Sequence, residues 1–145
     1  MTNTNYLKTD VEEYVRKKLE EEYGISFSRS HLSLTTGGTH EFNAVSRGGE
    51  IVATIRSSGG ITSGGNSPSG KIKGAIADLY FLSLVNARER LLVLTSTEFY
   101  QLLSDKLAGK VAPGIVLKPV PLPDVMASKV EHVQKVASKE VDGRW

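Results

Sequence analysis

The chain contains no cysteine and no long apolar run. Without cysteine there is no disulfide, no thiolate metal site and no cysteine nucleophile, and this composition is compatible with a reducing compartment. The chain has no stretch of about 18 apolar residues, so no membrane-spanning helix is predicted. The first ten residues, MTNTNYLKTD, lack the apolar core of a signal peptide. We therefore expect a cytoplasmic protein with no membrane partner.

The sequence also lacks a strong excess of charge of either sign. Its 18 basic and 16 acidic residues give a net charge of +2, which is too small to imply polyanion binding by itself, although a local basic patch can still bind. No G-x-S-x-G or H-E-x-x-H motif is present, and no aromatic cluster among basic residues indicates base stacking. The histidines His31, His40 and His132 are too scattered to predict a metal site by spacing.

Composition and periodicity indicate one globular α/β domain over residues 1–145. The 39% hydrophobic and 23% charged residues are typical of such a domain. The predicted elements are a helix capped by Thr9 or Asp10 and ending at Gly24, strand 25–34, a hairpin, helix 72–85, strand 91–94, a helix opened by the capping-box spacing Thr95-x-x-Glu98, edge strand 115–122 and a final helix from Pro123. The apolar helix 72–85 is expected to be the central packed helix.

The most informative segment is the predicted hairpin of residues 39–58. Gly48 and Gly49 accept the positive φ of a tight turn, and alternating apolar residues flank them. This turn sets Val45 opposite Val52. By strict alternation, one face of the hairpin then carries four polar side chains, those of Glu41, Asn43, Thr54 and Arg56.

The order helix, three-stranded meander, helix, strand, helix, strand, helix predicts a mixed, partly parallel sheet. Within that order, the segments HEFNAVS (40–46) and IVATIRSS (51–58) resemble the PD-(D/E)xK nuclease superfamily. Members of that family carry an Asp on the second strand, often within Glu-Phe-Asp, and Glu-x-Lys on the third strand. The resemblance implies a restriction-endonuclease-like fold. It also implies that carboxylates hold one or two Mg²⁺ or Mn²⁺ ions in an active member.

This chain departs from the family motif at three positions. The family's Asp falls on Asn43, its Glu on Thr54 and its Lys on Arg56. An amide and a hydroxyl are poor replacements, because hard cations prefer charged oxygen ligands. Arg56 stays protonated and cannot act as a base, but its guanidinium can clamp a phosphate. We expect a degenerate nuclease-like domain that binds nucleic acid or phosphate without efficient cleavage and needs no cofactor.

One alternative is a metal-dependent nuclease with a rearranged active site. In this hypothesis Glu41 is the remaining metal ligand, for Mg²⁺ or Mn²⁺. Glu12 or Glu13 supplies the helix glutamate seen in some relatives, and Lys71 or Lys73 replaces the motif lysine. The enzyme would then hydrolyse phosphodiester bonds.

A second alternative is a non-catalytic structural or oligomerisation module. Here Glu41 and Arg56 form a cross-strand ion pair, and Asn43 and Thr54 form a hydrogen-bonded pair on the same face. The partner would be another protein or a second copy of this chain, as in a homodimer.

A glycine-rich segment, residues 59–70, precedes the second predicted helix. Gly65 to Lys71 fits the P-loop spacing Gly-x4-Gly-Lys, but Ile72 follows where a P-loop needs Ser or Thr, so nucleotide hydrolysis is not expected. Amides at a helix start beside lysines still favour an anion. The candidate phosphate-binding residues are therefore Arg56, Gly70, Lys71 and Lys73, and the alternative is a glycine-rich flap.

Overall fold

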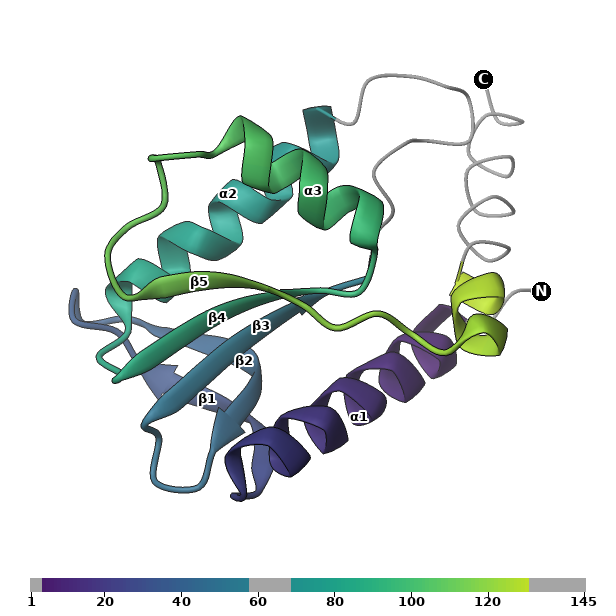
Figure 1. Ribbon diagram of the computed structural model, residues 1–145. Coiled ribbons are helices and arrows are strands. Elements are labelled where there is room, and N and C mark those ends of the chain that lie inside the picture. Colours follow the sequence, from purple (N-terminus) through teal and green to yellow (C-terminus); the bar gives the residue numbers. More distant parts are fainter. Residues whose placement is uncertain (1–3, 58–68, 131–145) are drawn as a thin grey trace, which may run out of the picture.

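The computed structural model describes residues 4–57 and 69–130 (Figure 1). Its elements are α1 (Thr4–Tyr23), β1 (Phe27–Ser33), β2 (Thr39–Ser46), β3 (Ile51–Arg56), α2 (Ser69–Leu84), β4 (Glu89–Leu94), α3 (Thr97–Lys106) and β5 (Ile115–Pro119). A further helical segment covers residues 124–130. This order of helices and strands is the one predicted from the sequence.

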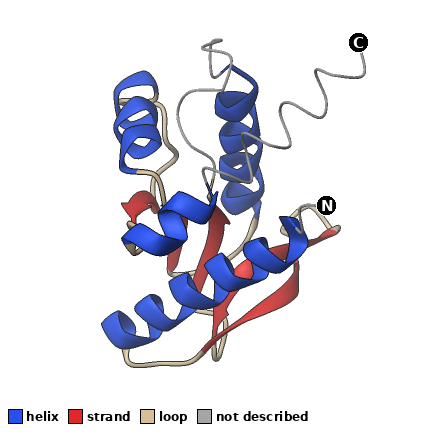
Figure 2. Cartoon of the chain, turned by 90° about the vertical axis from the view of Figure 1, so that its right-hand side faces the viewer, coloured by secondary structure: helices blue, strands red, loops and turns tan. Residues whose placement is uncertain are grey.

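The strands form one five-stranded sheet in the order β1-β2-β3-β4-β5. The pairs β1–β2 and β2–β3 are antiparallel, whereas β3–β4 and β4–β5 are parallel. The predicted α/β class with a mixed sheet is confirmed, and so is the edge position of the strand that contains Pro119. Figure 2, turned by 90°, shows the strands twisting between the helices.

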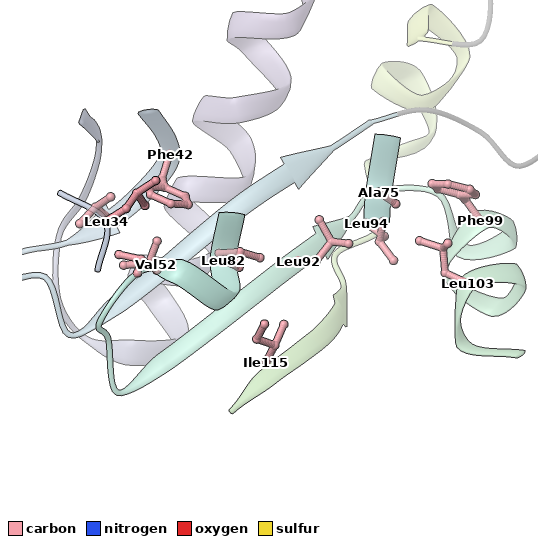
Figure 3. Close-up of a cluster of buried hydrophobic side chains, with 12 residues drawn as sticks. Leu34, Phe42, Val52, Ala75, Leu82, Leu92, Leu94, Phe99, Leu103 and Ile115 are labelled. Carbon is pink, nitrogen blue, oxygen red and sulfur yellow. The ribbon is translucent and has the colours of Figure 1, made fainter. Parts of the chain in front are cut away.

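Two apolar layers hold the helices against the sheet. On one face, α2 and α3 cover a cluster that includes Val52, Leu92 and Phe99 (Figure 3). On the other face, α1 covers a cluster that includes Val15 and Val93. We call these the α2 face and the α1 face of the sheet. β4 contributes to both clusters, which confirms that it is a strand buried on both sides.

The predicted glycine turn is confirmed. Gly48 and Gly49 have φ values of 94° and 78°, which side chains with a Cβ rarely adopt. Gly49 N donates a hydrogen bond to Ser46 O at 2.8 Å. Val45 pairs with Val52, as the turn required.

Three predicted helix starts are wrong, and α2 begins at Ser69 rather than at residue 72. α1 begins at Thr4 rather than after a cap at Thr9 or Asp10. Polar and acidic residues are favourable throughout the first turns, so they do not mark one boundary. α3 is capped by Ser96 rather than Thr95, because the Ser96 side chain accepts a hydrogen bond from the N–H of the third helical residue at 3.1 Å.

α2 is less deeply packed than its apolar sequence predicts. Its inner stripe, including Ala75 and Leu82, is buried. Its outer stripe is not, because Ile76 and Tyr80 are 46% and 58% exposed. α2 is a surface helix over one face of the sheet in the described part of the chain. Within residues 4–57 and 69–130, no helix is both long enough and apolar enough to cross a membrane.

Candidate functional site

A β-bulge in β2 decides where the motif positions point. Between Phe42 and Val45, β2 places two residues opposite a single residue of β1. An extra residue of this kind shifts the alternation of side chains by one position. Phe42 and Val45 therefore both pack on the α2 face, whereas Ala44 packs on the α1 face. Asn43 also turns toward α1, where its Nδ2 donates to Glu12 Oε1 at 3.3 Å.

The bulge separates the four polar residues predicted to share a face, Glu41, Asn43, Thr54 and Arg56. On the α1 face, Glu41 lies 3.7 Å from Arg29 and 3.8 Å from His31. On the α2 face, Arg56 forms an ion pair with Asp78 of α2. The predicted Glu41–Arg56 ion pair is therefore wrong, because strict alternation fails at the bulge.

Thr54 remains on the side of Arg56. Its neighbours Ala53 and Ile55 both pack into the α1-face cluster, so alternation along β3 directs Thr54 to the α2 face. The predicted hydrogen-bonded pair with Asn43 is wrong for the same reason. β3 has no bulge in its pairing with β4. The alternation of side chains is therefore shifted by one position in β2 but not in β3.

The α1 face carries a connected group of charged and polar side chains, the Glu12 network, which consists of Glu12, Arg16, Arg29, Glu41 and Asn43. Arg29 Nη2 donates to both Glu12 oxygens at 3.0 Å. Arg16 Nη1 lies 3.4 Å from Glu12 Oε1 and donates to Asn43 O at 2.9 Å. The Glu12 side chain is 6% exposed, and a carboxylate that deeply buried requires partners of this kind.

The Asn43 carboxamide uses both of its ends. Nδ2 donates to Glu12, and Oδ1 accepts from the main-chain N–H of Ile55 at 2.8 Å. The β2–β3 pairing stops at Ala44 and Ala53. Beyond that point the Asn43 side chain, rather than the main chain of β2, accepts the hydrogen bond from Ile55. An aspartate could accept from Ile55, but it could not donate to Glu12 and would repel it. The position therefore favours the amide.

The Glu12 network does not fit the divalent metal implied by the family resemblance. The β3 residues on this face are Ile51, Ala53 and Ile55, which offer no side-chain ligand. The two carboxylates, Glu12 and Glu41, are both engaged by Arg29. Within residues 4–57 and 69–130, no three His, Asp or Glu residues are grouped as a metal site requires. A hard cation needs several oxygen ligands that are not already neutralised.

The α2 face carries a second polar group, the Arg56 cluster, which consists of Arg56, Gly74 and Asp78. The guanidinium lies against α2 at Gly74, where an added Cβ would stand 2.6 Å from Arg56 Nη2. Asp78 binds Nε one turn further along the helix. Lys71 lies one turn before Gly74. Burial lowers the pKa of Lys71, while the charge of Glu98 on α3 acts in the opposite direction.

The structure brings together part of the predicted phosphate-binding group. Arg56 ends β3, and its carbonyl accepts from Thr95 N at 3.1 Å, just beyond the end of β4. Gly70, Lys71 and Lys73 lie in the first turns of α2, the helix that holds Arg56. The P-loop-like residues before Ser69, together with the rest of segment 58–68, lie outside the described residues.

The structure does not assemble the rearranged nuclease site. Glu41 lies on the α1 face with Arg29, whereas Lys71 and Lys73 belong to α2 on the other face. Of the two helix glutamates considered, Glu12 joins Glu41 through Arg29, and Glu13 is exposed.

Of the histidines in the described residues, His31 and His40 do not form a common site. His40 stacks on the Phe81 ring at 4.0 Å between centroids and with an interplanar angle of 7°, on the face opposite Glu41. His31 lies beside Glu41. His132 lies outside the described residues.

Three partners were not predicted from the sequence: Arg16 and Arg29, which bind Glu12, and Asp78, which binds Arg56. The Glu12–Arg16 spacing of four residues was a readable signal on a helix. Arg29 is two residues from Phe27 on the predicted first strand, so the two side chains share a face of that strand. Because Phe27 is apolar, this spacing indicated that Arg29 lies on the buried face. Its contact with a helix 17 residues away had no local signal.

No family model matches the chain, and neither the curated proteins nor the solved structures include a significant match. The resemblance to the PD-(D/E)xK superfamily therefore rests on the order of the elements and on the residues of the β2–β3 hairpin.

Proposed function

We propose that this chain is a restriction-endonuclease-like domain that binds nucleic acid through its phosphates and does not cleave it efficiently. The order of elements and the mixed sheet support the fold. The observation that carries the function is the placement of Arg56. By the resemblance, Arg56 falls at the family's lysine position, and at the end of β3 it is held against α2 at Gly74 and Asp78. We place the protein in the cytoplasm, as expected from its cysteine-free composition.

The Arg56 cluster has the chemistry of a phosphate site. A guanidinium presents parallel N–H groups that match phosphate oxygens. The Arg56 side chain is 28% exposed, and its Nε is held by Asp78, so the planar group is fixed in orientation. Lys71 and the exposed Lys73 add positive charge beside the start of α2, where helix amides also favour an anion.

Efficient cleavage is not supported by either face of the sheet. Arg56 stays protonated at neutral pH, so it cannot accept a proton from an attacking water. The carboxylates Glu12 and Glu41 of the α1 face are neutralised by Arg16 and Arg29, and the bulge keeps Glu41 away from Arg56. These groups can hold a phosphate, but they do not form a general base with a metal ligand set.

The test is fluorescence anisotropy of labelled DNA and RNA oligonucleotides in EDTA. If Arg56, Lys71 and Lys73 each contact one phosphate, affinity should fall about 40-fold between 50 and 200 mM salt. The double variant Lys71→Ala with Lys73→Ala should weaken binding at low salt and reduce the slope of log K against log salt from about −2.7 to about −0.9. The control is Lys8→Ala with Lys17→Ala, which removes the same charge from exposed positions of α1. Absence of binding at low salt would contradict the proposal.

The exposed apolar side chains on α2 favour one second candidate, self-association. Ile76 and Tyr80 lie one turn apart on the outer stripe of the helix, and each is about half exposed. Two such helices facing one another would bury both side chains. Sedimentation across a range of concentrations should then show a dimer that Ile76→Asp converts to a monomer. A wild-type chain that remains monomeric at every concentration would exclude this candidate.

A further inference from the structure

We infer that the guanidinium of Arg29 takes the place of a divalent cation between Glu12 and Glu41. The inference rests on the fold proposed above and on the rearranged ligand set, in which Glu12 of α1 and Glu41 of β2 would hold the metal ion. In this chain those carboxylates converge on a side chain of β1 instead. Arg29 Nη2 contacts both Glu12 oxygens at 3.0 Å, and Nη1 lies 3.7 Å from Glu41 Oε1.

The charges of the Glu12 network support this assignment. Glu12 and Glu41 carry two negative charges, and Arg16 and Arg29 carry two positive charges. The network is therefore neutral before any ion arrives, which removes the attraction that would draw a divalent cation to it. Arg29 is the member of the network that contacts both carboxylates, Glu12 on α1 and Glu41 on β2, as a bridging metal ion would.

The exposure of Arg29 makes the assignment testable. Its side chain is 43% exposed, whereas that of Glu12 is 6% exposed. The guanidinium thus lies between a buried carboxylate and the solvent. Removing it opens Glu12 to ions from solution and leaves Glu41, itself 41% exposed, free to approach. Two carboxylates without their shared cation offer oxygen ligands of the type that Mn²⁺ and Mg²⁺ prefer.

The experiment is thermal unfolding of the full chain with increasing Mn²⁺. The wild type should show no response. Arg29→Ala should be less stable without metal, and its unfolding midpoint should rise by about 4 °C when Mn²⁺ reaches tenfold above a millimolar Kd. Arg29→Ala combined with Glu41→Gln should lose this response. The matched control is Arg47→Ala, which removes one positive charge from an exposed turn and should remain unresponsive.

The outcomes divide clearly. An Arg29→Ala variant that unfolds at the same temperature with and without Mn²⁺ overturns the inference, as does a wild-type response that Glu12→Gln abolishes. If Arg29→Ala does not fold alone, recovery of folded protein on addition of Mn²⁺ supports the inference. If both Arg29→Ala and Arg29→Gln stay unfolded at every Mn²⁺ concentration, it is overturned. Nucleic-acid binding is measured on the wild type in EDTA, so failure of the proposed function is a separate result.

Discussion

Asn43 Oδ1 accepts a hydrogen bond from the main-chain N–H of Ile55 at 2.8 Å. A side chain of β2 thus replaces a ladder hydrogen bond at the point where β2 and β3 separate. The same carboxamide donates to Glu12 on α1, so one residue connects two strands and a helix. The resemblance to the PD-(D/E)xK superfamily implies a metal-binding aspartate at position 43, whereas the contacts of Asn43 are those of a structural bridge.

Replacing Asn43 should therefore destabilise the fold. Asn43→Ala leaves the Ile55 N–H and one oxygen of the buried Glu12 with fewer partners, and we expect the free energy of unfolding to fall by about 1–3 kcal/mol. The control is Ser28→Ala, an exposed polar residue on β1, which should change it by less than about 0.5 kcal/mol. Urea denaturation measures both. Equal effects would show that Asn43 is not a bridge.

Gly74 should be coupled to Arg56. Alanine is favoured over glycine within a helix by up to about 1 kcal/mol, but a Cβ at Gly74 would stand 2.6 Å from Arg56 Nη2. In the wild type, Gly74→Ala should therefore gain little stability, because the guanidinium must move away from Asp78. In an Arg56→Ala background the same substitution should recover most of the helix-propensity gain.

The control for this cycle is Gly70→Ala. A Cβ at Gly70 would meet nothing within 4 Å, so this substitution should have the same effect in both backgrounds. Free energies of unfolding for the variants give the coupling, which we expect to be about 0.5–1 kcal/mol. A Gly74→Ala effect that does not depend on Arg56 would exclude the contact.

Tyr23 should make stability depend on pH in the alkaline range. Burial, followed by interactions with Glu89 and Glu22, raises the pKa of Tyr23 from 10.0 to about 12. Between these two values the unfolded chain has lost the phenolic proton while the folded chain keeps it. The unfolded state then binds fewer protons, so the free energy of unfolding falls as pH rises.

The size of this decline is limited by solvent screening, because Tyr23 is only partly buried. We expect about 1 kcal/mol or less. The measurement is urea denaturation of the wild type and Tyr23→Phe across the interval from the ordinary tyrosine pKa of 10.0 to about 12. The phenylalanine variant should lose less stability over that interval. Parallel curves for the two proteins would show that the Tyr23 pKa is not raised.

The features that could be predicted from the sequence are those with local causes. Gly48 and Gly49 specify the hairpin turn, because few other residues adopt positive φ at two successive positions. The apolar run of β4 reflects burial on both faces. The α/β order follows from such local signals, and it was predicted correctly.

The arrangement of polar residues had no such local cause. The bulge at Asn43 depends on how β1 pairs with β2, and neither residue at the bulge is a glycine that would have indicated it. Arg29 finds its carboxylate on α1, and Arg56 finds Asp78 on α2. These partners are 17 and 22 residues apart in the chain, and only the packing of helices on the sheet brings them together.

The proposal that the chain lacks efficient metal-dependent cleavage is tested most directly by incubating supercoiled plasmid with purified chain and Mn²⁺. The carboxylates Glu12 and Glu41 lie on the face opposite Arg56, and they are paired with Arg16 and Arg29. We therefore predict that the plasmid stays supercoiled. Nicking that requires Mn²⁺ and disappears in Glu41→Ala would contradict this description of the site.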